Sequence, residues 1–153
     1  MANAPFTKSR RIRFSHTDPA GIVYFPNYFD FCNAVVEDFY TERLGVDYAK
    51  LIFERRRGTP IVHAACDFFA PSVMGDSLDF TLLLDRVGKS SIEFSIYGHA
   101  QAILRLQARI VTVYMDLETR KSDPIPDDLR QRFVQYRTES AGWSAPAKPK
   151  ATP

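Results

Sequence analysis

Two neighbouring segments near the middle of the chain alternate between apolar and polar residues. In 77–85 the apolar positions fall on every second residue, and 91–97 repeats the pattern (Leu78, Phe80, Leu82 and Leu84, then Ile92, Phe94 and Ile96). Because successive side chains of a strand point to opposite faces, this spacing predicts antiparallel strands with one covered face. The sequence Val87–Ser90 between them predicts a hairpin turn. A sheet with one apolar face needs a second layer, which the rest of the chain has to supply.

That second layer is predicted on the N-terminal side of these strands. Between Asn27 and Gly45 apolar residues recur at helical spacing, among them Phe29, Cys32, Val36 and Phe39. Pro26 suits the first turn of such a helix, Asn27 is a candidate N-cap, and Gly45 is a typical C-terminal stop. We therefore expect one long amphipathic helix packed on the sheet.

Further elements complete an α+β arrangement. Segments 7–14, 63–71 and 102–117 predict additional strands, and shorter helices are expected at 47–57 and from Pro126 onward. The predicted sheet thus has about five or six antiparallel strands. A sheet that one helix covers leaves edges and surface exposed, so we expect a homo-oligomer.

The totals favour a single domain. The chain has 153 residues, of which 45% are hydrophobic, and this is too short for two comfortable domains. We expect the domain to span residues 1–137. Residues 138–153 are small, polar and rich in proline, which predicts a disordered tail.

Charge and hydropathy exclude several classes of protein. The net charge of +2 is too weak to predict nucleic-acid binding. No apolar run approaches the roughly 20 residues of a membrane span. The N-terminal residues lack the apolar core of a signal peptide, so a cytoplasmic location is expected.

The cysteines and histidines do not predict a metal site. Cys32 and Cys66 lie far apart, match no zinc spacing, and are expected to be reduced and buried. His16, His63 and His99 are scattered along the chain. We expect His63 to be a hydrogen-bonded core residue and no metal to be bound.

One carboxylate stands in an unusual position. Asp18 lies between a polar segment and a Pro-Ala-Gly corner, just before the long predicted helix. No histidine, serine or cysteine is spaced to form a familiar triad with it. An Asp-Pro pair also favours turns, so a purely structural role for Asp18 is the alternative.

The residues around that corner resemble a known family. The sequence "TDPAGIVYFPNY" at Thr17–Tyr28, "GTPIV" at Gly58–Val62, Asp76 with Leu78, and Lys89 are similar to the 4-hydroxybenzoyl-CoA thioesterase family. The similarity runs in order over residues 8–135. It implies the hotdog fold, in which an antiparallel sheet wraps around one long helix. It also implies an acyl-CoA substrate and a dimer with active sites at its interface, commonly paired into a tetramer.

The resemblance assigns roles to particular residues. Asp18 matches the catalytic carboxylate, and Phe25 matches the position whose backbone N–H polarises the thioester carbonyl. The implied substrate contacts are Asn33, Tyr48, Thr59, Pro60 and Ile61. The implied CoA contacts are Lys89 and Ser90. The family implies no cofactor and no metal.

Elementary chemistry explains why a thioesterase needs so few catalytic groups. A thioester already has a good leaving group, so it needs only a nucleophile or base and a positive field for the developing oxyanion. A carboxylate supplies the first, and the free N–H groups at a helix start supply the second. No triad is required.

The sequence indicates the type of reaction more clearly than it indicates the acyl group of the substrate. Asn33 replaces an acidic residue that contacts the phenol hydroxyl in some members of the family, which weakens 4-hydroxy selectivity. Phe25–Pro26 stands where enzymes for aliphatic chains often carry a histidine, which favours an aromatic acyl group such as 4-hydroxybenzoyl or benzoyl. Alternatives are a broad short- or medium-chain thioesterase, a non-catalytic acyl-CoA binding module and a dehydratase. Arg55–Arg57 is expected on a solvated helix face, with contact to CoA phosphates as the alternative.

Overall fold

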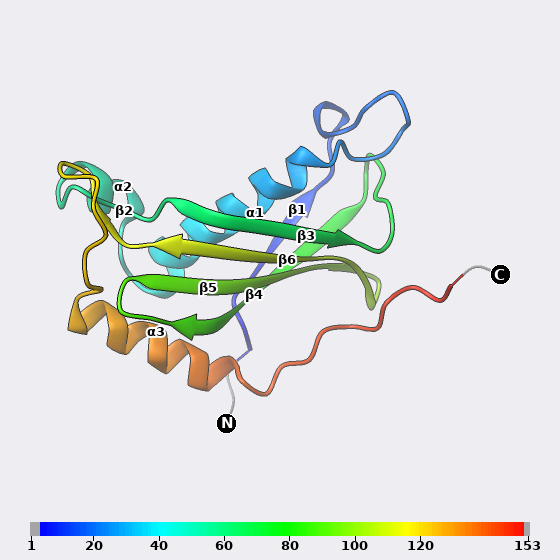
Figure 1. Cartoon of the computed structure of the whole chain (residues 1–153). Helices are drawn as coiled ribbons and strands as arrows, with labels where there is room; N and C mark the ends of the chain where they lie inside the picture. Colours follow the sequence, from blue (N-terminus) through cyan, green and yellow to red (C-terminus); the bar gives the residue numbers. More distant parts are fainter. Residues whose placement is uncertain (1–3, 152–153) are drawn as a thin grey trace.

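The computed structural model describes residues 4–151 and has the predicted α+β layers (Figure 1). Five antiparallel strands form the main sheet in the order β1 (Thr7–Arg11), β4 (Ser77–Val87), β5 (Ser91–Ala100), β6 (Ile103–Val113) and β3 (Ile61–Phe68). A separate two-stranded sheet pairs β2 (Arg57–Gly58) with β7 (Met115–Asp116). The hotdog thioesterase fold implied by the sequence is confirmed.

The predicted hairpin forms the centre of the sheet. In β4 and β5, Leu82 lies opposite Ile96 and Leu84 lies opposite Phe94. The apolar residues of the alternation all lie in the core, as the spacing predicted (Leu78, Phe80, Leu82, Leu84, Ile92, Phe94 and Ile96). Gly98 continues this face, and a Cβ there would come within 2.7 Å of Leu106.

The long helix packs on that face. Helix α1 (Pro26–Asp38) continues through a π-helical turn, η2 (Phe39–Arg43), and Gly45 follows with a φ of +69°. The ring of Phe31 lies 5.7 Å from that of Phe80 between centroids. The predicted helical segment is confirmed.

The predicted cap of this helix is different in the structure. Phe25 is the N-cap and Pro26 begins the helix. The Asn27 side chain instead donates from Nδ2 to the carbonyl oxygen of His16, at 2.9 Å. It thereby ties the helix to the preceding 3₁₀ turn, η1 (Phe14–His16).

Two further helices flank the sheet. Helix α2 (Tyr48–Phe53) begins at Asp47, whose side chain accepts from the N–H of Lys50 at 3.0 Å. Helix α3 (Asp127–Ser140) packs against β4, where the buried Tyr136 hydroxyl donates to the carbonyl oxygen of Leu82. The same hydroxyl accepts from the N–H of Phe6 at 2.9 Å.

The C-terminal segment differs from the expected disordered tail. Helix α3 continues to Ser140, and residues 141–151 run along the sheet toward the far end of β6 (Figure 1). Trp143 packs on Tyr97 with ring centroids 5.3 Å apart. Composition could not reveal this, because the packing partners of the tail are distant in sequence. Residues 152–153 of the expected tail, like residues 1–3 of the expected domain, lie outside the described residues.

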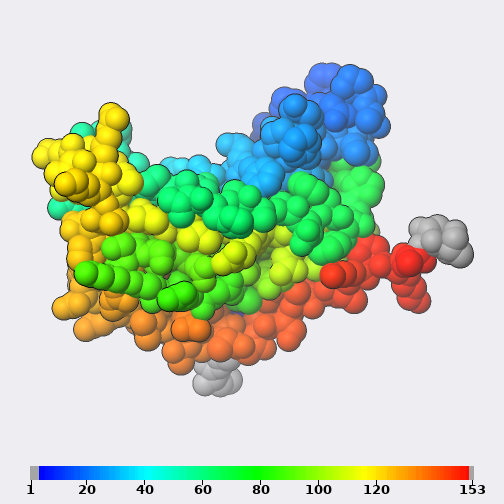
Figure 2. Space-filling model, in the orientation of Figure 1, coloured from blue at the N-terminus to red at the C-terminus, as the bar shows by residue number. Residues whose placement is uncertain are grey.

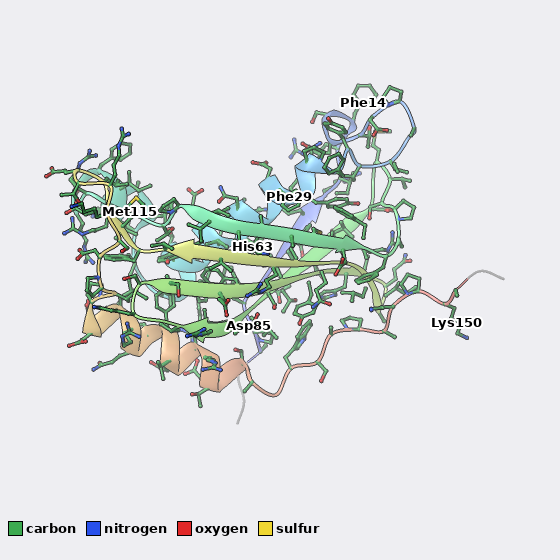
Figure 3. All side chains as sticks on the ribbon, viewed as in Figure 1. Phe14, Phe29, His63, Asp85, Met115 and Lys150 are labelled. Carbon is green, nitrogen blue, oxygen red and sulfur yellow. The ribbon has the colours of Figure 1, made fainter. Side chains whose placement is uncertain are left out.

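Strand β3 is an open edge of the sheet. All its residues are exposed except the half-buried Cys66, and its only strand partner in residues 4–151 is β6. The expectation of a buried His63 is therefore wrong, because His63 lies on this edge (Figure 3). Cys32 is buried as expected.

Across residues 4–151, none of the helices combines the length and the apolar character needed to cross a membrane.

Candidate active site

Asp18 lies in a closed turn between η1 and α1. Its backbone N–H donates to the carbonyl oxygen of Ile22 at 3.0 Å, and its carbonyl oxygen accepts from Gly21 at 2.9 Å. Gly21 has a φ of +81°, a conformation that few residues other than glycine adopt readily. Thr17 and Val23 bridge the two sides of the turn. The Pro-Ala-Gly corner therefore serves to turn the chain back on itself.

The carboxylate itself is oriented by this turn. Oδ1 of Asp18 accepts from the backbone N–H of Ala20 at 2.8 Å. Oδ2 accepts no hydrogen bond from residues 4–151. Among the described residues, one carboxylate oxygen is thus held by the backbone and the other is without a hydrogen bond.

The start of α1 offers one spare backbone donor beside this turn. Asn27 and Tyr28 donate their N–H groups to the carbonyl oxygens of Tyr24 and Phe25, at 2.9 and 3.1 Å. Tyr24 donates to His16 at 2.9 Å, and Pro26 has no N–H. Within residues 4–151 the N–H of Phe25 donates to no acceptor. Among the described N–H groups at the start of α1, that of Phe25 is therefore the remaining candidate for an oxyanion donor, and Phe25 is also the residue that the sequence analysis named.

An apolar cavity of about 250 Å³ lies against this helix start. Its lining comes from the turn, α1 and the segment that follows β3 (Ile22, Val23, Phe25, Tyr28, Phe68, Phe69, Ala70 and Pro71). Tyr28 is buried, which raises the pKa of its hydroxyl above the ordinary value. We call this cavity with Asp18 and Phe25 the hook half-site. Its ring-lined wall suits a flat aromatic group.

A second cavity, of about 410 Å³, collects the predicted substrate contacts. It is lined by Asn33, Tyr48, Thr59, Pro60 and Ile61 together with Ile52, Gly58 and Leu117. The hydroxyls of Tyr48 and Thr59 lie 2.8 Å apart, and Thr59 is buried. We call this cavity the loop half-site. The five residues that the sequence assigned as substrate contacts thus line one cavity, although they come from different elements, and their contact with substrate stays a prediction.

The two half-sites do not meet within one chain. The hook half-site includes Phe68, at one end of β3, and the loop half-site includes Ile61, at the other end. Figure 2 shows the surface hollowed above β3, between a projection formed by the chain before α1 (blue) and one formed around β7 (yellow). Figure 3 places Phe14 on the first projection and Met115 near the second, with His63 on β3 between them.

The predicted CoA contacts lie at the same end of the sheet as the loop half-site. Lys89 is exposed in the β4–β5 turn, and its carbonyl oxygen accepts from Ile125 at 2.9 Å. Ser90 accepts from the N–H of Tyr114 at 2.7 Å. Neither residue lines a half-site.

The arginine run does not form a helix face. Helix α2 ends at Phe53, and Arg57 lies in β2, where it pairs with Asp123 at 2.9 Å and with Asp116 at 3.5 Å. The paired Arg57 holds the small sheet in place. Arg55 and Arg56 are exposed.

The sequence analysis missed the aromatic wall of the hook half-site. Phe68 ends β3 and Phe69 follows it, and both were counted only as sheet residues, whereas Tyr28 was noted only as the last residue of the family motif. Consecutive phenylalanines at the end of an edge strand were the available signal. Leu117 was missed at the loop half-site because it reaches Gly58 from a distant turn, where a Cβ on Gly58 would lie 2.7 Å from it.

Comparison with known proteins identifies the superfamily. The sequence profile of the Thioesterase-like superfamily matches residues 12–133. The chain belongs to this superfamily. Among curated proteins this thioesterase-like chain is similar to a 1,4-dihydroxy-2-naphthoyl-CoA hydrolase of Nostoc punctiforme, with 28% identity over 137 residues, 90% of this chain and 92% of the relative.

Two solved structures have the same fold as this thioesterase-like protein. One is a gentisyl-coenzyme A thioesterase, with a TM-score of 0.77, 28% identity, and coverage of 83% of this chain and 98% of that one. The other is a 1,4-dihydroxy-2-naphthoyl-CoA thioesterase from Synechocystis, with a TM-score of 0.75, 27% identity, and coverage of 86% and 96%. The superfamily is thus confirmed, whereas these relatives are named for acyl groups other than 4-hydroxybenzoyl.

Proposed function

We propose that the protein hydrolyses the thioester of an aromatic acyl-CoA to the free acid and CoA. The observation that carries this proposal is an Asp18 carboxylate oriented by a hydrogen-bonded turn, which is followed at the helix start by a spare N–H at Phe25, a residue that lines an aromatic cavity. The names of the relatives support an aromatic acyl group, and they favour one that carries hydroxyl groups.

The chemistry follows from these two groups. Asp18 accepts a proton from a water molecule as the water oxygen bonds to the carbonyl carbon. The carbonyl electron pair moves onto its oxygen, which accepts from the Phe25 N–H. When the pair returns, the C–S bond breaks and CoA leaves as the thiolate. In the alternative route Asp18 attacks the carbonyl itself, and water then cleaves the anhydride.

Two copies of the chain would complete the site. Edge strand β3 lacks lysine and arginine, whereas the other edge, β1, carries Lys8, Arg10 and Arg11. Charged residues on an edge strand oppose pairing, so β3 is the edge suited to a second copy. Antiparallel pairing of two β3 strands about a two-fold axis places the Ile61 end of one against the Phe68 end of the other. Each hook half-site then faces a loop half-site of the partner.

The loop half-site supplies hydrogen-bonding groups suited to ring hydroxyls. Asn33 is exposed to the cavity opening, and the Tyr48–Thr59 hydroxyl pair lies in the wall. An amide both donates and accepts, so Asn33 can bond a phenol without requiring one. We therefore expect hydroxylated aryl-CoA esters to be good substrates and benzoyl-CoA to be a weaker one. Lys89 and Ser90 stay our candidates for CoA contacts, and pairing of dimers into tetramers stays a prediction.

Substitution of Asp18 tests the reaction directly. Asp18→Asn keeps the size and the Oδ1 acceptor but removes the base, so we expect kcat to fall by about 10²–10⁴. The release of CoA thiol is measured with 1,4-dihydroxy-2-naphthoyl-, gentisyl-, 4-hydroxybenzoyl-, benzoyl- and hexanoyl-CoA. Near wild-type turnover by the variant would remove Asp18 from the mechanism. A preference for hexanoyl-CoA would overturn the aromatic assignment.

Isotope labelling separates the two routes. After single-turnover hydrolysis in ¹⁸O-water, peptide mass spectrometry measures whether ¹⁸O has entered the Asp18 carboxylate. Label in Asp18 indicates the anhydride route with attack of water at the Asp18 carbonyl carbon, and label in the released acid alone assigns the attack of water to the acyl carbonyl carbon.

A further inference from the structure

Residues 141–148 form an ordered segment that the superfamily match does not include. The match ends at residue 133, and α3 ends at Ser140. From there the chain crosses the face of β5 that points away from α1. Trp143 lies on this face, with its ring 5.3 Å from that of Tyr97 and 6.0 Å from that of His99. We call residues 141–148 the C-terminal strap.

The strap then takes the place of β3 beside β6. Strand β3 ends where Phe68 lies opposite Leu106, and the chain turns away from β6 at Phe69 and Ala70. Beyond that point the N–H of Leu104 donates to the carbonyl oxygen of Ala147 at 2.9 Å. Ala147 also forms a parallel bridge with Ile103. A backbone hydrogen bond fixes the strap at the edge that β3 vacates.

The end of the strap lies on the wall of the hook half-site. Lys148 Nζ lies 4.6 Å from the centroid of the Phe69 ring. Phe69 lines the aromatic cavity, and its N–H donates to Arg105 at 2.8 Å. A cation over the face of a ring restricts that ring, because it is attracted to the negative face. The strap thus connects the outer face of the sheet to the aromatic cavity.

We propose that the C-terminal strap holds the Phe69 wall in the position that binds the acyl group, with Trp143 as the anchor and Lys148 as a positioning residue. The inference rests on the proposed function, since it concerns the cavity of the same site. Neither strap residue contacts Asp18 or the Phe25 N–H within residues 4–151. Loss of the strap therefore weakens acyl binding and leaves the reacting groups in place. Such a change raises KM with little change in kcat.

Substitutions at Lys148 test this role in the full chain. Lys148→Met removes the charge and keeps the length, and we expect KM for benzoyl-CoA to rise by about two- to fivefold, the usual strength of an exposed cation–π contact. Lys148→Arg retains a cation and should restore the wild-type KM. Lys148 is exposed, so the melting temperature of either variant should equal that of the wild type.

Lys150→Met is the matched control. It removes the same charge two residues further along the chain, and Figure 3 shows Lys150 beyond the contact with the sheet. The KM of this control should equal that of the wild type. If it rises as much as in Lys148→Met, general attraction of CoA phosphates is the cause and the positioning role is wrong.

Trp143 allows a test that does not depend on turnover. It is the only tryptophan of the chain, so its fluorescence reports the strap alone. In the Asp18→Asn variant, saturation with benzoyl-CoA should reduce acrylamide quenching of Trp143, because an acyl group bound to the wall stabilises the docked strap in return. CoA alone should leave the quenching unchanged.

Calorimetric titration of the same variant separates the two hypotheses. Binding of benzoyl-CoA with no change in quenching overturns the strap inference alone. Absence of any binding overturns the proposed function and this inference with it. Binding with reduced quenching, weaker in the Asp18→Asn, Lys148→Met double variant, supports both.

Discussion

At the scale of single residues, the backbone N–H of Phe25 is the oxyanion donor that we propose. The neighbouring N–H groups of Tyr24, Asn27 and Tyr28 are used in short hydrogen bonds of the turn. Pro26 at the first helical position removes a competing donor. Within residues 4–151 the sequence thus leaves one N–H without an acceptor at the start of the helix, and this is the donor that we propose for a bound carbonyl.

Replacement of Phe25 by proline removes this donor. The φ of Phe25 is −53°, within the range that a proline ring imposes, so Phe25→Pro should retain the fold. We expect kcat to fall by about 10²–10³, the usual cost of one oxyanion donor. Phe25→Ala keeps the N–H and is the control, with near wild-type kcat and a raised KM. Equal kcat in the two variants would argue against the assigned donor, and circular dichroism verifies the fold of each.

At the scale of elements, the C-terminal strap adds stability to the outer face of β5. His99 lies under Trp143 and its Nε2 is 2.9 Å from the Thr81 hydroxyl. Burial lowers the pKa of His99 below its ordinary value of 6.5, and the nearby Asp79 carboxylate opposes part of this shift. The folded protein thus favours the neutral imidazole.

A pH dependence of stability follows from this shift. Below about pH 6.5 the unfolded chain binds a proton at His99 that the folded chain does not yet bind, so stability falls as the pH is lowered toward the folded-state pKa. Above pH 6.5 this contribution is fully present. Thermal unfolding between pH 7.5 and 5 should show the loss, and His99→Gln should reduce it. An unchanged slope in the variant would assign the pH dependence to other groups.

At the scale of the whole molecule, β3 is the edge of the sheet through which we propose that two copies assemble. The hook and loop half-sites lie at opposite ends of β3, across the hollow of Figure 2. Neither half-site contains all the predicted contacts. In a single chain, the hook half-site with its Asp18 carboxylate therefore lacks a loop half-site facing it. Assembly is therefore part of the proposed function and not an addition to it.

A lysine on the open edge should prevent this assembly. Ala65 lies near the middle of β3 and is exposed, so Ala65→Lys puts a charge where two strands would pair. We expect the variant to sediment as a monomer at micromolar concentration, to keep its circular dichroism spectrum and to lose thioesterase activity. Ser9 occupies an exposed position of the other edge strand, β1, so Ser9→Lys is the matched control and should remain an active oligomer. An active monomer of Ala65→Lys would contradict the composite site.

Complementation tests the pairing of unlike half-sites. Asp18→Asn damages the hook half-site, and Thr59→Tyr fills the loop half-site at a buried position. Each homodimer should be nearly inactive, because each site has one damaged half. Subunit exchange should restore activity, because one site of every heterodimer then combines two intact halves. Failure to recover activity after verified exchange would place all groups in one chain.

The sequence by itself determined the layers and indicated the two groups that we propose to react, Asp18 and Phe25. Alternation in 77–97 and helical spacing after Asn27 are local patterns, and they fix which face of each element is apolar whatever the rest of the chain does. The Asp18 corner and the position of Phe25 beside Pro26 are also local, so they were predictable. The hydrogen bond from the Asn27 side chain to His16, the open edge at His63 and the ordered strap were not.

Only the tertiary structure decided what depends on distant contacts. The strap is ordered because the Trp143 ring packs on Tyr97 and the Ala147 carbonyl oxygen accepts from the N–H of Leu104. The members of each pair are far apart in sequence, so no local pattern predicts the contact. The same applies to the aromatic wall and to the separation of the two half-sites along β3. Local propensity determines the faces of helices and strands, whereas the packing of remote segments determines which side chains share a cavity.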